Sequence, residues 1–75
     1  MHCKISKGIY RHYKGKDYQV IDFPIDSATD EKMVLYKPLY DIPELGPNPL
    51  FVQTIERFTE IISWNGQDTP RFTLK

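Results

Sequence analysis

A single cysteine, Cys3, is present in the 75 residues, so the chain cannot form an internal disulfide. A domain without such a cross-link suits a reducing compartment, and we expect a cytoplasmic protein. No apolar run approaches the roughly 20 residues that cross a bilayer. The segment from Met1 to Lys7 is not followed by the apolar stretch of a secretory signal. The sequence therefore predicts neither a membrane span nor a signal peptide.

The chain also lacks a net charge, since ten Lys and Arg balance ten Asp and Glu. Tight nonspecific binding to nucleic acid needs several Lys or Arg side chains that no acid neutralises, so a net charge of zero disfavours such binding. The charges are nevertheless segregated along the chain. Residues 1–16 carry five basic side chains and no acidic one, and residues 17–31 carry five acidic side chains and no basic one. If these segments form neighbouring strands, opposite charges neutralise each other across the ladder. The alternative is a basic face that meets phosphate or an acidic partner.

Catalytic and metal-binding patterns are missing as well. The two histidines, His2 and His12, are fewer ligands than a zinc site needs. No Ser-His-Asp order and no phosphate-cradling glycine loop is present. Cys3 has no fixed base beside it, and Glu56 with Glu60 is typical of solvated charges. We therefore expect no enzyme, no metal and no cofactor.

Aromatic and turn residues are what the sequence does contain. One Trp, five Tyr and four Phe can fill a small core, because each ring buries roughly 150–250 Å². Six prolines and four glycines indicate many turns and little helix. A chain of this length forms one domain, residues 1–75, with a thin core. We expect that core to include Tyr18, Val34, Val52 and Phe58.

Alternating apolar segments predict short β-strands over residues 8–14, 18–25, 32–37, 50–53 and 59–64. The alternation within the second segment changes phase midway, which indicates a bulge or a sharp bend. Asn65-Gly66 predicts a hairpin turn, and residues 71–74 are expected to pair back as a tail strand.

Residues 54–58 are predicted to form one helical turn with Thr54 as its N-cap. Five short strands with such a turn before the last one match a mainly β, five-stranded SH3-like barrel. The alternative is an amphipathic helix over residues 54–63, which would give an α+β domain.

Residues 38–49 contain four prolines, which rule out a helix interior and a central strand. They predict a long loop whose apolar side chains, Leu39, Tyr40, Ile42 and Leu45, are partly exposed. Exposed apolar clusters often mark contacts between chains. We expect a protein partner or self-association through this loop, and the alternative is a loop that caps one barrel end.

Tyrosine, histidine and lysine gather in one short stretch, residues 10–14. Tyrosine offers an apolar body with a polar tip, and His12 titrates near neutrality. A folded-back tail would add Arg71. The candidate ligand-binding residues are therefore Tyr10, His12, Tyr13, Lys14, Tyr36 and Arg71.

These residues suit a surface groove for a peptide, a base or a small anion. The structural alternative places Tyr10 and Tyr13 partly in the core. The same stretch could instead bind nucleic acid, with Arg11, Lys14 and Lys16 contacting phosphate and a tyrosine stacking on a base. We expect a small protein-binding module, with nucleic-acid binding as the alternative.

The segments GIYRHYKG (residues 8–15) and YQV (18–20) resemble the opening signature of domain-of-unknown-function family 1653, which consists of short bacterial proteins. Shorter pieces follow in the family's order, among them VLYK (34–37), FTE (58–60) and PRF (70–72). The resemblance covers residues 7–73. It implies architecture and little chemistry, because the family has no established activity. Lys37 stands where the family usually has arginine, and FVQT (51–54) where it usually has WVRP.

Overall fold

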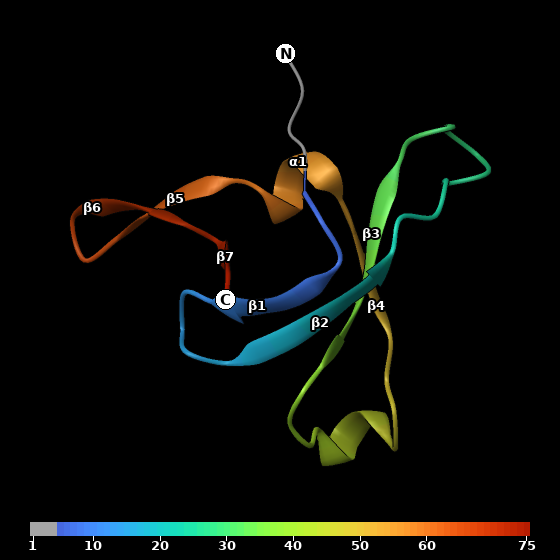
Figure 1. The fold of residues 1–75 in the computed structure, drawn as a ribbon, viewed down its shortest axis with the longest axis horizontal. Helices are drawn as coiled ribbons and strands as arrows, with labels where there is room; N and C mark the ends of the chain where they lie inside the picture. Colours follow the sequence, from blue (N-terminus) through green and yellow to red (C-terminus); the bar gives the residue numbers. More distant parts are fainter. Residues whose placement is uncertain (1–4) are drawn as a thin grey trace.

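The structure is a computed structural model that describes residues 5–75, so Cys3 and His2 lie outside it. Its strands are β1 (Gly8–His12), β2 (Asp17–Asp22), β3 (Met33–Pro38), β4 (Phe51–Thr54), β5 (Ile61–Trp64), β6 (Gln67–Pro70) and β7 (Phe72–Leu74). They form two antiparallel sheets, one with the order β4-β3-β2-β1-β7 and the other a β5–β6 hairpin (Figure 1). The mainly β class predicted from the sequence is confirmed.

Strand β2 contains the predicted bulge. Val20 lies opposite Tyr36 of β3, whereas the next paired residue, Asp22, lies opposite Leu35, so the register shifts between them. The extra residue returns the following side chains to the opposite face. Phe23 consequently packs against the core instead of facing solvent.

One helical turn, α1 (Ile55–Phe58), separates β4 from β5. The Thr54 hydroxyl accepts a hydrogen bond from the backbone N–H of Arg57 at 3.1 Å, which caps the turn. The predicted turn and its cap are confirmed. The alternative helix over residues 54–63 is wrong, because β5 already begins at Ile61. Within residues 5–75, the helices are too short and too polar to cross a bilayer.

The hairpin at Asn65-Gly66 is confirmed, and both residues have the positive φ that such a turn requires, 52° and 79°. Its return strand is β6, which the sequence did not predict. Pro70 is tolerated at the end of β6 because this strand is exposed on one side. The predicted tail strand is shorter than expected, and its Phe72 pairs with His12 of β1.

A closed barrel is not found in residues 5–75. Among the described strands, the edges of the larger sheet, β4 and β7, do not pair with each other, and β5 pairs only with β6. The hairpin projects away from the larger sheet (Figure 1). Side chains of this hairpin are accordingly exposed: Ile61 by 58% and Trp64 by 40%.

The proline-rich segment, residues 38–49, is largely an irregular loop, as predicted. Pro38 still belongs to β3 as its last residue, opposite Tyr18. A short 3₁₀ turn spans Pro43–Leu45. Leu39 and Leu45 are 46% and 51% exposed, which confirms the predicted exposure of these loop side chains.

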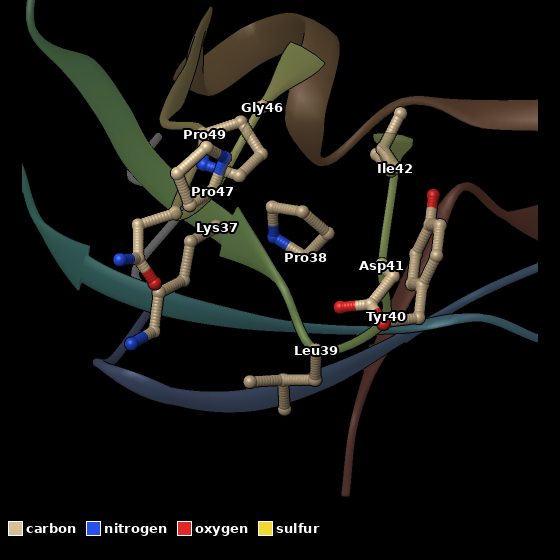
Figure 2. A pocket seen from close by; sticks show the side chains of 10 residues that line it. Lys37, Pro38, Leu39, Tyr40, Asp41, Ile42, Gly46, Pro47 and Pro49 are labelled. Carbon is tan, nitrogen blue, oxygen red and sulfur yellow. The ribbon is translucent and has the colours of Figure 1, made fainter. Parts of the chain in front are cut away.

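The loop and the end of β3 line an open cavity of about 230 Å³. Pro47 and Pro49 lie on one side of it, Tyr40 and Ile42 lie on the other, and Pro38 lies between them (Figure 2). Binding pockets for drug-sized molecules are usually about 300–1,000 Å³. This cavity is therefore too small for such a ligand.

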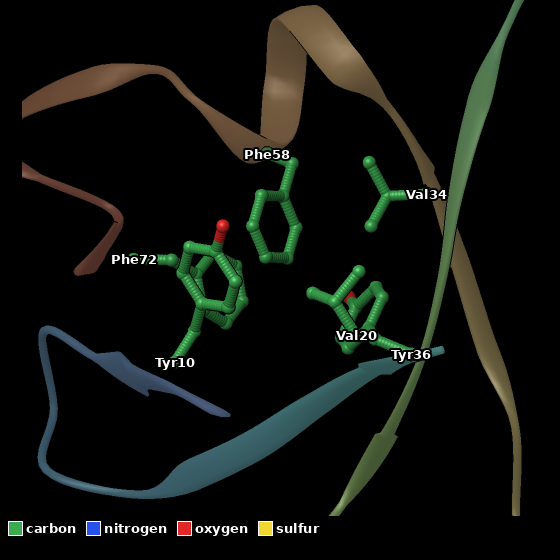
Figure 3. Close-up of a cluster of buried hydrophobic side chains, with 6 residues drawn as sticks. All are labelled: Tyr10, Val20, Val34, Tyr36, Phe58 and Phe72. Carbon is green, nitrogen blue, oxygen red and sulfur yellow. The ribbon is translucent and has the colours of Figure 1, made fainter. Parts of the chain in front are cut away.

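Within residues 5–75, six buried side chains form the core: Tyr10, Val20, Val34, Tyr36, Phe58 and Phe72 (Figure 3). Phe58 of α1 stacks on Phe72 of β7, with ring centroids 4.1 Å apart and planes 4° apart. Tyr10 and Tyr36 each meet Phe58 edge-on at 5.4 Å. Rings from several strands thus share one interior, as expected.

One predicted core residue is wrong. Val52 is 56% exposed and lies on the outer face of β4. Its neighbour Phe51 is half-buried and packs against Tyr36 with ring centroids 5.6 Å apart. Edge strand β4 therefore presents Phe51 to the core and Val52 to solvent.

Candidate functional site

Five partly exposed rings form a continuous row on the surface, here called the aromatic row: Trp64, Tyr13, His12, Tyr18 and Tyr40. Successive ring centroids along this row are 4.9, 4.4, 6.1 and 5.6 Å apart. The rings come from β5, from the end of β1 and its following turn, from β2, and from the loop after β3. Folding thus joins side chains that are distant in the sequence into one surface.

The aromatic row is supported by the core beneath it. Phe72 lies 5.0 Å from His12 and 5.6 Å from Tyr18, measured between ring centroids. The hydroxyl groups of Tyr18 and Tyr40 form a 2.6 Å hydrogen bond. Burial and this bond raise the pKa of Tyr18, so its hydroxyl stays protonated at neutral pH. Side chains fixed in this way lose little conformational entropy on binding.

His12 is held in one orientation by the turn that follows β1. Its Nδ1 accepts a hydrogen bond from the backbone N–H of Lys14 at 3.2 Å, so the neutral ring carries its proton on Nε2. Burial lowers the pKa of His12, and the charges of Arg71 and Lys14 lower it further. The ring is therefore neutral at pH 7.

We expect His12 to titrate below its ordinary pKa of 6.5. The unfolded chain then binds a proton more readily than the folded one, so stability is fully present above pH 6.5 and falls as the pH drops through the folded-state pKa. The measurement is the pH dependence of the His12 ring signals by NMR, with unfolding curves at about pH 5 and 7.5.

His12→Gln should remove this part of the pH dependence, whereas His2→Gln, the matched control, should leave the His12 titration in place. A His12 pKa at or above 6.5 would contradict the partly buried environment of this ring.

Two lysines lie over rings at the margin of the aromatic row. The ammonium group of Lys14 is 5.8 Å from the Tyr13 ring centroid, and that of Lys16 is 5.0 Å from the Tyr40 centroid. A cation over a ring face is attracted by the electrons of that face. Among the described residues, no carboxylate lies within ion-pair distance of either lysine.

Three further charged residues, Arg11, Asp17 and Lys75, form a cluster of ion pairs. Arg11 and Lys75 both bind Asp17, at 2.9 and 3.0 Å. The hydrogen bond from Arg11, followed by that from Lys75, lowers the pKa of Asp17 to about 2. The predicted neutralisation across β1 and β2 is confirmed for Arg11 with Asp17 and for Lys7 with Asp22 at 3.8 Å. Basic side chains still outnumber acidic ones here, because the single carboxylate of Asp17 pairs with both Arg11 and Lys75.

A cavity of about 350 Å³ opens beside the aromatic row. His12 and Tyr13 line it from the row, and Arg11 and Lys75 add positive charge. Gly15 and residues of β6 and β7 complete the lining. Its volume falls within the usual range of ligand pockets, about 300–1,000 Å³. It can receive a side chain of a binding partner.

The structure brings four of the predicted ligand-binding residues together at the aromatic row: His12, Tyr13, Lys14 and Arg71. The backbone N–H of Tyr13 donates to the carbonyl of Arg71 at 3.0 Å, and the Arg71 guanidinium binds Glu60 at 2.7 Å.

The other two predicted residues, Tyr10 and Tyr36, are core residues that are 6% and 5% exposed. The Tyr10 hydroxyl donates to the carbonyl of Ser6 at 2.8 Å, and the Tyr36 hydroxyl accepts from the Gln53 amide at 2.6 Å. Burial raises the pKa of Tyr36. In this arrangement both tyrosines support the surface from beneath and have no direct access to a ligand on it.

Sequence reasoning missed Trp64 and Tyr40 as members of the aromatic row. The position of Trp64 directly before the Asn65-Gly66 turn was a usable signal, because side chains at a hairpin tip are exposed. Tyr40 was expected to be partly exposed in the proline-rich loop, but its place beside Tyr18 depends on the path of that loop. Within residues 5–75, no three His, Cys, Asp or Glu side chains are grouped as a metal site would require.

Comparison with known proteins adds a family and a fold. A family model described as "Protein of unknown function (DUF1653)" matches residues 8–74. A crystal structure of a DUF1653 protein from Bordetella bronchiseptica is similar to this fold, with a TM-score of 0.84 and 28% identity. That similarity covers 95% of this chain and 87% of the other. No curated protein matches the chain.

Proposed function

Because the chain belongs to the DUF1653 family, whose description names no activity, we propose its function from the geometry of the site. It is a binding module that holds an acidic, extended segment of a partner protein on the aromatic row, and it acts by binding and not by catalysis. One observation carries this proposal: a continuous row of partly exposed rings has a lysine over two of its members and borders a cavity that Arg11 and Lys75 help to line.

Rigid aromatic side chains favour binding to protein. Aromatic residues are enriched in protein interfaces, where they bury much area at small entropic cost. The 40% exposed ring of Trp64 offers such a contact at one end of the aromatic row. Tyr40 offers another at the far end, where the exposed Leu39 and Leu45 of the proline-rich loop support a second contact. A partner segment following the aromatic row would therefore reach loop 38–49.

Unpaired positive charge favours an acidic partner. Lys14 and Lys16 are exposed, and a negative segment would increase the rate of encounter and find complementary charge. A carboxylate entering the 350 Å³ cavity would meet Arg11 and Lys75, two positive charges that share the single carboxylate of Asp17.

Nucleic acid is the second candidate, because bases stack on rings and phosphates pair with lysines. Two details favour protein over it. The lysines lie over the faces of Tyr13 and Tyr40, where a base would stack. Tyr13 with Trp64 and Tyr18 with Tyr40 meet edge-to-face, so they present no parallel pair of open faces.

The test is affinity capture from an extract of the native cells, with and without nuclease. We expect the wild-type chain to retain a protein in both extracts. The double variant Lys14→Glu/Lys16→Glu should retain at least about tenfold less, because opposed charges are replaced by like ones.

Lys7→Glu/Lys32→Glu is the control for net charge, since it makes the same change beside the starts of β1 and β3, although it also breaks the exposed ion pair of Lys7 with Asp22. It should retain the partner as the wild type does. Retention that disappears with nuclease would favour the nucleic-acid candidate, and equal loss in both double variants would remove the aromatic row from the proposal.

We further propose that the fold is an open form of the SH3-like barrel and that the protein acts in the cytoplasm. The five-stranded sheet with α1 placed directly before β5 supports the first proposal. The single cysteine supports the second, since it leaves the fold without an internal disulfide.

A further inference from the structure

Strand β4 is an edge of the larger sheet, paired with β3 on one side only within the described residues. Such an edge exposes backbone N–H and C=O groups that pair readily with another strand. Proteins usually protect their edges with charged side chains, bulges or prolines. Residues 50–54, from Leu50 to Thr54, have none of these.

The outer face of this edge is apolar. Leu50 is 58% exposed and Val52 is 56% exposed. Val52 lies opposite Leu35 of β3, which is half-buried on the same face. Two neighbouring strands therefore present apolar side chains up to the edge itself.

We propose that β4 pairs antiparallel with β4 of a second copy of this chain, about a two-fold axis at Val52. In this register Val52 lies opposite its own equivalent, and Phe51 lies opposite Gln53 of the second copy. The two larger sheets then join into one. On the outer face, the side chains of Leu35 and Val52 from both copies form a continuous cross-strand row.

Charge identifies the second copy as the occupant. In a two-fold interface each residue near the axis meets its own equivalent, so any charge there would face a like charge. The nine residues from Pro47 to Ile55 carry no charge at all, in a chain where 27% of residues are charged. This edge can meet itself without repulsion, whereas an acidic partner of the kind proposed above would find no opposite charge on it.

The other edge of the same sheet differs in this respect. Strand β7 has only three residues, and Lys75 follows it directly. A lysine at the edge is a common protection against strand pairing. The chain thus protects one edge and leaves β4 open.

Charge variants at the axis test this proposal. Sedimentation equilibrium should find the wild-type chain as a dimer within about 10 µM to 1 mM. Val52→Glu and Val52→Lys, each alone, should weaken the dimer about tenfold or more, because like charges meet at the axis. An equimolar mixture of the two variants should recover the dimer, since residue 52 of one copy faces residue 52 of the other.

Ile61→Glu is the matched control, because Ile61 is equally exposed on β5, and it should remain a dimer. Circular dichroism of each variant shows whether the fold is kept. A wild-type monomer at every concentration, or a mixture of Val52→Glu and Val52→Lys that stays monomeric, would overturn the proposal.

Discussion

Phe58→Ala will lower the free energy of unfolding by about 3–5 kcal/mol, the usual cost of deleting a buried ring. Phe58 is 1% exposed and is in contact with rings from three strands. A domain of this length has a total stability of roughly 4–11 kcal/mol. The variant should therefore lose a large share of its stability.

Denaturant unfolding followed by circular dichroism measures this loss. Ile61→Ala is the matched control three residues later in the chain, and it should change the free energy by less than about 0.5 kcal/mol because its side chain is exposed. A loss below about 1 kcal/mol for Phe58→Ala would mean that α1 does not complete the core.

Phe72→Ala should have a similarly large effect, about 3–5 kcal/mol, and should also disturb the aromatic row. Phe72 stacks on Phe58 and lies 5.0 Å from His12. Removing its ring exposes His12 to water, so the His12 pKa should rise toward 6.5. Core stability and the geometry of the site thus depend on the same side chain.

Unfolding curves and the NMR titration of His12 together test this dependence, the latter also in the milder variant Phe72→Leu. Leu74→Ala, on the same strand but 53% exposed, is the control and should leave both quantities nearly unchanged. A double-mutant cycle between Phe58 and Phe72 should give a coupling of about 0.5–1.5 kcal/mol. An unchanged His12 pKa in Phe72→Leu would separate the core from the aromatic row.

Local chemistry explains which elements could be predicted from the sequence. Asn65-Gly66 specifies its turn because both residues tolerate a positive φ, and Thr54 specifies the start of α1 because its hydroxyl caps the turn. The bulge in β2 was visible as a change in alternation. These signals lie within a few residues of the structures that they determine.

Other features depend on tertiary context. Leu50, Phe51 and Val52 are all apolar, so alternation does not decide which of them faces the core. Strand β6 contains polar residues and Pro70, and it forms because the preceding turn brings its backbone beside β5. Because β6 has no alternation of apolar and polar residues, the sequence pattern could not predict it.

The candidate site was predictable in part. His12, Tyr13 and Lys14 are consecutive, so their proximity follows from the sequence. Their neighbours Trp64 and Tyr40 arrive through long-range packing that no local pattern encodes. Tyr10 and Tyr36 were candidates as tyrosines, yet the sheet register turns both inward.

Trp64 is the single tryptophan of the chain and lies at one end of the aromatic row, so its fluorescence reports directly on binding there. The decisive measurement is a titration of the protein with the purified captured partner, and separately with a single-stranded oligonucleotide, followed by Trp64 emission. We predict a saturable change with the partner that Lys14→Glu/Lys16→Glu abolishes, and no change with the oligonucleotide. Binding of the partner without any change in Trp64 emission, or a response to the oligonucleotide alone, would contradict a protein-binding role for the aromatic row.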